Sequence, residues 1–245
     1  MKENNKVAVF IDGENISAKY ASRIVEEASN YGDVIIKRVF ADWTNQAVSP
    51  WKEAVSKNSL KAEQQFNAVK GKNSSDIRLI IDAMTILFEK NIDVFCLASS
   101  DSDFTSLVQE LRERGKVVVG FGRQQTVQEF VNAFSEFIYL DEKIAVEAKM
   151  PVEKSEQKVQ EQPLLARKKM KALSEIIDRL IEENGKALYS QIGLEMRNKY
   201  SDFVPRNYGF KTMKPFMAAL MKDKYQIKTE ADGTSLYLVP LAKKK

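Results

Sequence analysis

Near its start the chain reads VAVFIDGENI at residues 7–16, where five apolar residues are followed at once by an acidic, glycine-containing turn. An unbroken apolar run of this kind is typical of a strand buried on both faces, as in a parallel sheet. Similar runs recur at 34–40, 94–98, 116–121 and 137–140, and helical patterns separate them at about 16–31, 50–58, 76–89, 104–114 and 126–134. The alternation predicts an α/β fold, with helices on both faces of the parallel sheet and an edge strand at 137–140. The helical spacing at 76–89 predicts one apolar face, formed by Ile77, Ile80, Ile81, Met84 and Phe88.

The composition excludes several classes of enzyme. The 245 residues include no histidine and a single cysteine, Cys96. Internal disulfides, histidine or cysteine zinc sites and histidine-activated nucleophiles are therefore excluded. An enzyme built from this sequence depends on carboxylates, amines, hydroxyls and bound metal ions. No apolar run is long enough to span a membrane and the start lacks a signal peptide, so we expect a cytoplasmic protein with no membrane partner.

Charge is unevenly distributed along the chain and divides it in two. Residues 1–149 have a net charge of −3 and residues 164–245 a net charge of +8, although the whole chain carries only +4. Between them lies a stretch rich in Glu, Gln and Lys, which is typical of a solvated linker. We predict a first domain at 1–147, a flexible linker at 148–163 and a second domain at 164–245. A basic module is typical of nucleic-acid binders, although ordinary surface lysines produce the same charge.

Carboxylates follow the predicted strands at the edge where open parallel sheets bind ligands. Asp12 ends the first strand, Asp101 and Asp103 follow the strand at 94–98, and Asp76 begins a helix after a polar loop. Each has a structural alternative, because Asp76 and Asp103 stand where helix caps occur and Asp12-Gly13 is also a turn signal. Converging carboxylates would repel one another unless a cation or shared protons neutralise them. Without histidine, Mg²⁺ or Mn²⁺ is the expected cofactor, because both accept oxygen ligands.

Other acidic sites on α/β folds fit the sequence less well. Aspartyl-phosphate phosphotransferases need Asp-x-Asp after the first strand, where this chain has Asp-Gly-Glu-Asn, and the later lysine loop of receiver domains is not recognisable. A metal-dependent nuclease fits better, because it needs only carboxylates, a cation and water. Asp82 follows Asp76 by six residues, which turns it about 120° around the helix, so we expect a structural or supporting role for Asp82.

Four motifs in this order and spacing resemble the NYN domain, a PIN-like nuclease fold, over about residues 5–142. They are VFIDGENI at 9–16, KNSSDIRLIIDAM at 72–84, SSDSDF at 99–104 and GFG at 120–122. Each motif alone is weak, whereas their combination is highly specific. The resemblance implies metal-dependent cleavage of RNA phosphodiester bonds.

The resemblance also assigns roles to individual residues. It implies that Mg²⁺ or Mn²⁺ is held by Asp12, Asp76, Asp101 and Asp103, and that Asn15 is the polar member of the catalytic set. Such ions would polarise the scissile phosphate and activate a water molecule. Thr85 stands where some relatives carry an acidic residue. PIN-like domains often pair, so a homodimer through the N-terminal domain is one expectation.

Three basic residues near the same sheet edge are further candidates for phosphate contacts, with a solvated surface role as the alternative: Lys70, Lys72 and Arg123.

The C-terminal part has the pattern of a winged helix. Helical patterns cover 164–184, 190–199 and 213–222, and two strand patterns at 225–229 and 235–239 flank Asp232-Gly233, a hairpin signal. Winged helices bind nucleic acids in many proteins and other proteins in some, so the architecture alone leaves both functions open.

The run PRNYGFKTM at 205–213 resembles the OST-HTH/LOTUS domain, over about residues 165–240. The resemblance implies RNA binding, with a leaning towards structured or guanine-rich RNA. The expected partner is single-stranded or structured RNA. Arg206, Tyr208, Lys211 and Lys214 supply guanidinium, aromatic and ammonium groups that stack on bases and neutralise phosphates. The alternative is that Tyr208 and Phe210 are core anchors, which we favour for Phe210.

The sequence thus predicts a divalent-metal-dependent ribonuclease whose basic winged-helix domain tethers the RNA. One alternative is a non-catalytic RNA-binding or scaffold protein with a vestigial acidic pocket. Another is an adaptor whose winged helix recognises a protein.

Overall fold

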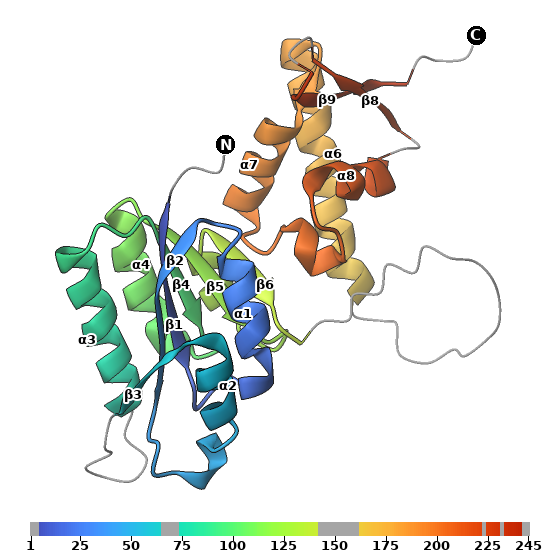
Figure 1. Ribbon diagram of the computed structural model, residues 1–245. Helices are drawn as coiled ribbons and strands as arrows, with labels where there is room; N and C mark the ends of the chain where they lie inside the picture. The colour runs from blue at the N-terminus through green and yellow to red at the C-terminus, as the bar shows by residue number, and fades with distance from the viewer. Residues whose placement is uncertain (1–4, 65–73, 142–161, 222–223, 231–232, 242–245) are drawn as a thin grey trace, which may run out of the picture. The chain divides into compact units, whose positions relative to one another are not determined.

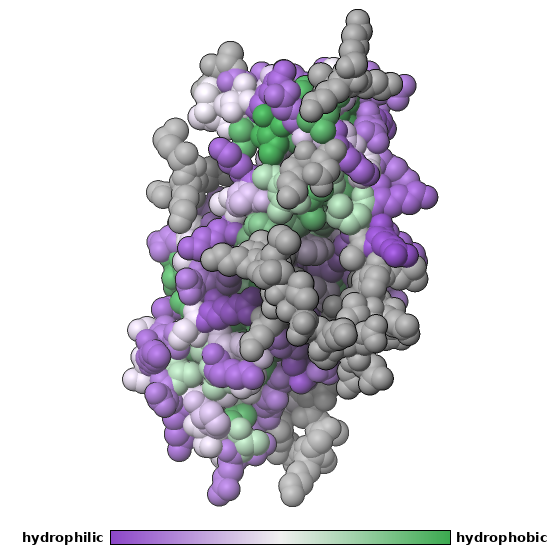
Figure 2. All heavy atoms as spheres, turned by 90° about the vertical axis from the view of Figure 1, so that its right-hand side faces the viewer, coloured by the Kyte–Doolittle hydropathy of each residue, from purple (hydrophilic) through white to green (hydrophobic). Residues whose placement is uncertain are grey.

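The computed structural model describes residues 5–64, 74–141, 162–221, 224–230 and 233–241. The chain divides into two compact units, Met1–Glu142 and Lys143–Lys245. Within the described ranges, no helix combines the length and the apolar character that crossing a membrane requires. Figure 2 shows one face of the molecule, on which hydrophilic side chains predominate and hydrophobic ones form smaller patches.

The first unit is built on a six-stranded parallel sheet in the order β3-β2-β1-β4-β5-β6 (Figure 1). This confirms the predicted α/β fold with a parallel sheet. The strand order reverses between β1 and β4, because the chain builds outward from β1 in both directions. The strands are β1 (Lys6–Asp12), β2 (Asp33–Ala41), β3 (Lys61–Gln64), β4 (Val94–Ala98), β5 (Val117–Gly122) and β6 (Glu136–Tyr139).

Helices cover both faces of this sheet, which explains why β1 is apolar at successive positions (Figure 1). Val7, Val9 and Ile11 belong to one core, beside α1 and α2, whereas Ala8 and Phe10 belong to the other, beside α3, α4 and α5. The helices are α1 (Ala21–Ala28), α2 (Trp51–Asn58), α3 (Ser74–Glu89), α4 (Thr105–Glu113) and α5 (Gln128–Ala133), with 3₁₀ turns η1 (Ala18–Tyr20), η2 (Gln46–Val48) and η3 (Ser102–Phe104).

Two local expectations differ from the structure. The helix expected at 16–31 is split into η1 and the shorter α1, which ends at Ala28. Strand β3 was not predicted, because its sequence KAEQ has neither an apolar run nor a clear alternation. It forms as a short edge strand paired with the end of β2.

The apolar face predicted for α3 is only partly in the core. Ile77, Ile81 and Phe88 are exposed to 58%, 54% and 65%. The buried face is a neighbouring arc of the helix, formed by Leu79, Asp82, Ala83, Ile86 and Leu87. Both arcs have helical spacing, so periodicity alone did not distinguish them.

The second unit is a three-helix arrangement with a small antiparallel sheet in the order β7-β9-β8, as expected for a winged helix. Its core includes Leu173, Ile192, Phe216 and Leu238. The elements are α6 (Gln162–Asn184), β7 (Ala187–Leu188), α7 (Tyr189–Lys199), η4 (Pro205–Tyr208), α8 (Met213–Met221), β8 (Tyr225–Thr229) and β9 (Leu236–Pro240). The linker predicted at 148–163 lies outside the described residues, apart from the first two residues of α6.

Candidate active site and nucleic-acid interface

Asp12 is the last residue of β1 and is almost fully buried, with 3% of its surface exposed. One carboxylate oxygen, Oδ1, accepts hydrogen bonds from the backbone N–H groups of Glu14 (3.2 Å) and Asn15 (3.1 Å). The other, Oδ2, accepts from the Ser99 hydroxyl at 2.9 Å. All three donors are uncharged, so they fix the position of the carboxylate without neutralising its charge.

Burial is the main influence on the charge of Asp12 and raises its pKa to about 7. The negative charge of Asp76 raises the pKa further, whereas the hydrogen bonds from Ser99 and from the backbone of Asn15 and Glu14 lower it. The carboxyl group is therefore held where its negative charge is unfavourable at neutral pH unless a positive charge joins it.

Asp76 lies in the first turn of α3 and is half-buried. Burial raises its pKa to about 6, and the charges of Asp101, Glu14 and Asp103 add to this effect. The Ser75 hydroxyl, next to Asp76, donates a hydrogen bond to the Glu14 carboxylate. These interactions bring the carboxylates that follow β1 and β4 into one group with the start of α3.

The loops after β1 and β4 are joined by hydrogen bonds at the point where the strand order reverses. The backbone N–H of Ser100 donates to Oδ1 of Asn15 at 3.1 Å, and the N–H of Asp101 donates to the Ser99 hydroxyl at 3.0 Å. Asp101 caps η3 by accepting from the N–H of Asp103 at 2.9 Å. The cap in this turn is therefore Asp101, and Asp103 supplies the N–H group that it binds.

The acidic side chains at this edge of the sheet do not form a complete metal site. Among the residues that the structure describes, no three His, Cys, Asp or Glu side chains are already arranged to hold one ion. All the possible ligand atoms of these acidic side chains are oxygens. The side chains repel one another, and a cation would relieve this repulsion. Sequence reasoning placed Asp12, Asp76, Asp101 and Asp103 here but did not assign Glu14, although Glu14 is part of the same DGEN motif.

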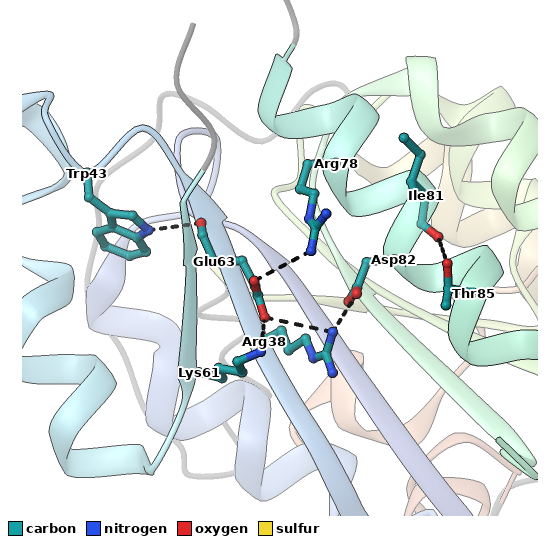
Figure 3. Close-up of polar contacts among 8 residues, drawn as sticks. All are labelled: Arg38, Trp43, Lys61, Glu63, Arg78, Ile81, Asp82 and Thr85. Carbon is teal, nitrogen blue, oxygen red and sulfur yellow. Dashed lines mark hydrogen bonds and ion pairs between the residues drawn. The ribbon is translucent and has the colours of Figure 1, made fainter. Parts of the chain in front are cut away.

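An ion-pair network holds α3 against the edge of the sheet and so fixes the helix that carries Asp76 (Figure 3). Arg38 on β2 pairs with Asp82, and its guanidinium lies 3.8 Å from the Glu63 carboxylate. Glu63 also pairs with Lys61 at 2.6 Å and with Arg78 at 3.8 Å. Asp82 therefore has the structural role expected from its position on the helix.

Thr85 lies away from the acidic group. Its hydroxyl donates to the backbone oxygen of Ile81 at 2.8 Å, as Figure 3 shows. Nine residues separate it from Asp76, which corresponds to about 13 Å along the helix and to the opposite side of its axis. The missing acidic side chain at this position therefore leaves the carboxylates near Asp76 unchanged.

Arg123 follows β5 at the same edge of the sheet. Its backbone N–H donates to the Ser100 hydroxyl at 2.9 Å, which ties this loop to the one that carries Asp101. Its guanidinium Nε is buried and has no hydrogen-bond partner among the described residues. Lys70 and Lys72, the other two candidates for phosphate contacts, lie outside the described residues.

In the second unit the four predicted RNA contacts differ in their surroundings. Lys211 and Lys214 are exposed, whereas Arg206 is half-buried. The Tyr208 ring stacks on Phe216, with 4.9 Å between ring centroids, and its hydroxyl is 3.5 Å from the Lys169 ammonium. Tyr208 is thus part of the aromatic packing of this unit, as is Phe210, 5.5 Å from Phe216.

Comparison with known families gives two matches. The model of the NYN domain matches residues 6–141, and that of the OST-HTH/LOTUS domain matches residues 165–236. The NYN domain is a PIN-like nuclease domain, and the OST-HTH/LOTUS domain is an RNA-binding domain. The first match spans the described sheet and its acidic edge, and the second spans the winged helix.

Individual relatives add little about activity. An uncharacterized protein of Methanocaldococcus jannaschii is 27% identical over 182 residues, which are 73% of this chain and 71% of that protein. The crystal structure of a protein of unknown function from Vibrio parahaemolyticus is 17% identical, with a TM-score of 0.48, and covers 58% of this chain and 96% of its own.

Proposed function

We propose, on the premise that the chain belongs to the NYN domain family, that it is a divalent-cation-dependent ribonuclease with an RNA-tethering second domain. The observation that supports the proposal is the mutual repulsion of carboxylates at this edge, where the charge of Asp76 raises the pKa of Asp12 and the charge of Asp101 raises the pKa of Asp76. Carboxylates whose pKa is raised by burial and by neighbouring charges are enriched at functional sites.

The donor chemistry of this group fits Mg²⁺ or Mn²⁺. Mg²⁺ commonly keeps several waters and binds through one or two carboxylates together with substrate phosphates, so a complete protein cage is not required. Asp12 and Asp76 would hold the ion, with Asp101 and Asp103 around them. A cation bound there would supply polarisation of the scissile phosphate and activation of the attacking water.

The chain's own residues would position and orient these groups. The Ser99 hydroxyl, which donates to Asp12 and accepts from the N–H of Asp101, fixes two of the carboxylates relative to each other. Asn15 holds the loop after β4 through Ser100. Arg123, whose loop is tied to the loop of Asp101 through Ser100, would offer its guanidinium to an RNA phosphate.

The second unit would raise the RNA concentration at the nuclease site. Lys211 and Lys214 are exposed, and no ion pair involves them within the described part of the chain, so they are available to phosphates. RNA held on one unit reaches the other at a high effective concentration when a linker joins the two. The acidic first unit then does not need to bind RNA tightly by itself.

A cleavage assay on the full chain tests the proposal. End-labelled single-stranded and hairpin RNAs are incubated with protein in Mg²⁺, Mn²⁺ or EDTA. We expect cleavage with either metal, none in EDTA, and a loss of about 100-fold or more in Asp12→Asn and Asp101→Asn, because each removes a ligand charge.

Asp33→Asn is the matched control. Asp33 is an exposed aspartate at the start of β2, at the amino-terminal ends of the parallel strands and so at the end of the sheet opposite to Asp12. It should cut like the wild type. If Asp12→Asn and Asp101→Asn also cut like the wild type, the activity belongs to another site. RNA that is bound but never cut would instead support the non-catalytic RNA-binding protein.

A further inference from the structure

A hollow of about 300 Å³ lies directly beside the acidic group, between the loops that follow β1 and β2. It is lined by residues 13–18 together with Asn45, Ala47, Val48, Pro50 and Trp51. Sequence reasoning did not identify it, because its second wall comes from a loop that carries none of the acidic motifs. Its volume lies at the lower end of the range found for small-molecule sites.

The lining of the hollow is mixed, with somewhat more polar than apolar surface. Ile16, Val48 and Trp51 are buried and form its small apolar part. Asn15 and Asn45 stand at the rim, and the side-chain oxygen of each is already used, by the N–H groups of Ser100 (3.1 Å) and Ala47 (3.0 Å). Their amide NH₂ groups have no partner within the described residues and remain available as donors. A small, mostly polar hollow with free amide donors at its rim matches the edge of a nucleobase, which carries acceptor atoms.

One short segment separates the hollow from the acidic group. The N–H groups of Glu14 and Asn15 bind Asp12 on one side, and the Gly13 carbonyl accepts from the Trp51 indole at 2.9 Å on the other. A Cβ on residue 13 would lie 2.9 Å from Val39 Cγ2, so the segment is tightly packed. A ligand in the hollow therefore adjoins a ligand at Asp12.

We propose that this hollow binds one nucleobase of the RNA strand, next to the phosphate that is cleaved. The inference rests on the proposed ribonuclease function and adds a recognition element to the same site. A strand that enters it is held at a fixed register relative to Asp12, so the hollow would determine which phosphodiester bond is cut and would favour bases whose edges carry acceptors.

Cleavage of RNAs that each lack one base tests the register. The bond cut in an unmodified RNA is mapped first, and single abasic nucleotides are then placed at each position around it. We expect one position within two nucleotides of the cut to lower the rate about tenfold or more, since aromatic and apolar base contacts have effects of this size. A rate that is equally sensitive, or insensitive, at every position overturns the proposal.

A second measurement does not depend on cleavage. The chain has two tryptophans, so Trp43→Phe leaves Trp51 as the only one. In EDTA, adenosine or uridine 5′-monophosphate should change Trp51 fluorescence saturably, whereas ribose 5-phosphate should not. A response to ribose 5-phosphate equal to that of the nucleotides, or no response to either nucleotide, overturns base recognition.

A variant that fills the hollow, compared with a control variant outside it, tests whether the nucleotide binds there. In the Trp43→Phe background, Ala47→Phe occupies the rim of the hollow and should weaken nucleotide binding about tenfold. Ala62→Phe adds the same side chain at an exposed alanine on β3, outside the lining, and should leave binding unchanged. Equal loss in both variants contradicts the assignment. If the full chain cuts no RNA under any condition, the ribonuclease proposal fails, and the fluorescence titration alone decides whether the hollow binds a base.

Discussion

Replacing Asp12 by asparagine should stabilise the first unit at pH 8 in the absence of divalent cations. The carboxyl group is 3% exposed, and burial raises its pKa from 3.8 to about 7. Asparagine keeps the size of the side chain and the acceptor for the N–H groups of Glu14 and Asn15, but it carries no charge. The substitution removes the cost of burying the charge, and its main loss is the hydrogen bond that Oδ2 accepts from the Ser99 hydroxyl, because an amide NH₂ cannot accept it.

Proton linkage gives the sign and the size of the stability difference between Asp12→Asn and the wild type. Between pH 4 and 7 the folded state retains a proton on Asp12 that the unfolded chain has lost, so wild-type stability falls as pH rises through this window. About three pKa units at 1.36 kcal/mol each correspond to about 4 kcal/mol. We expect Asp12→Asn to be more stable than the wild type by about 2–4 kcal/mol at pH 8 and by much less at pH 4.

Urea unfolding followed by tryptophan fluorescence measures this difference. Both tryptophans, Trp43 and Trp51, lie in the first unit, so their signal reports that unit alone. Added Mg²⁺ or Mn²⁺ should stabilise the wild type at pH 8, by about 2.7 kcal/mol at one hundred times the dissociation constant, and should not stabilise Asp12→Asn. The exposed control Asp33→Asn should follow the wild type throughout.

Two results would refute this reasoning. The first is a stability difference between Asp12→Asn and the wild type that stays the same from pH 5 to pH 8, because the buried carboxyl would then not titrate in that range. The second is stabilisation by divalent cations that is equal in the two proteins, since the cation would then bind elsewhere.

Three further predictions concern packing and RNA contacts. Asp82→Ala should lower the free energy of unfolding of the first unit by about 3 kcal/mol in urea titrations, because it leaves a largely buried guanidinium without its closest partner; a loss below 0.5 kcal/mol would contradict this. Leu79→Ala should cost about 2–5 kcal/mol in the same assay, whereas Ile81→Gln should change stability by less than about 0.5 kcal/mol, because only Leu79 is buried. Lys211→Gln with Lys214→Gln should weaken RNA binding and reduce the slope of log K against log salt by about 0.7–0.9 for each lysine that contacts a phosphate; an unchanged slope would place the RNA elsewhere.

The fold was predictable from the sequence because its main strands are unusually clear. The apolar runs at β1 and β4 are buried on both faces, and each ends in polar residues that occupy the edge of the sheet. The apolar runs therefore predicted the fold, and the acidic motifs that follow them predicted where on the sheet the candidate site lies. The edge strand β3 gave no such signal, because an edge strand with one charged face needs few apolar residues.

Other features depend on contacts that sequence spacing does not encode. Two apolar arcs on α3 have the same period, and the buried one is the arc whose Leu79, Ala83 and Ile86 pack in the core beside β1 and β4. The Ser99 hydroxyl links Asp12 to the N–H of Asp101, a pairing that requires β1 and β4 to be neighbours. The hollow beside Asn15 requires the loop after β2 to fold back, which periodicity does not predict.

The two edges of the sheet have a consequence for handling the protein at high concentration. Each edge strand is only four residues long, and β3 presents the paired charges of Lys61 and Glu63. At the other edge, the Glu136 carboxylate accepts a hydrogen bond from the Tyr31 hydroxyl at 2.6 Å. Short, charged edges discourage the addition of a strand from another chain, which is a common route to aggregation. If two copies of the first unit do associate, helix surfaces such as the exposed apolar residues of α3 offer a better contact than continuation of the sheet.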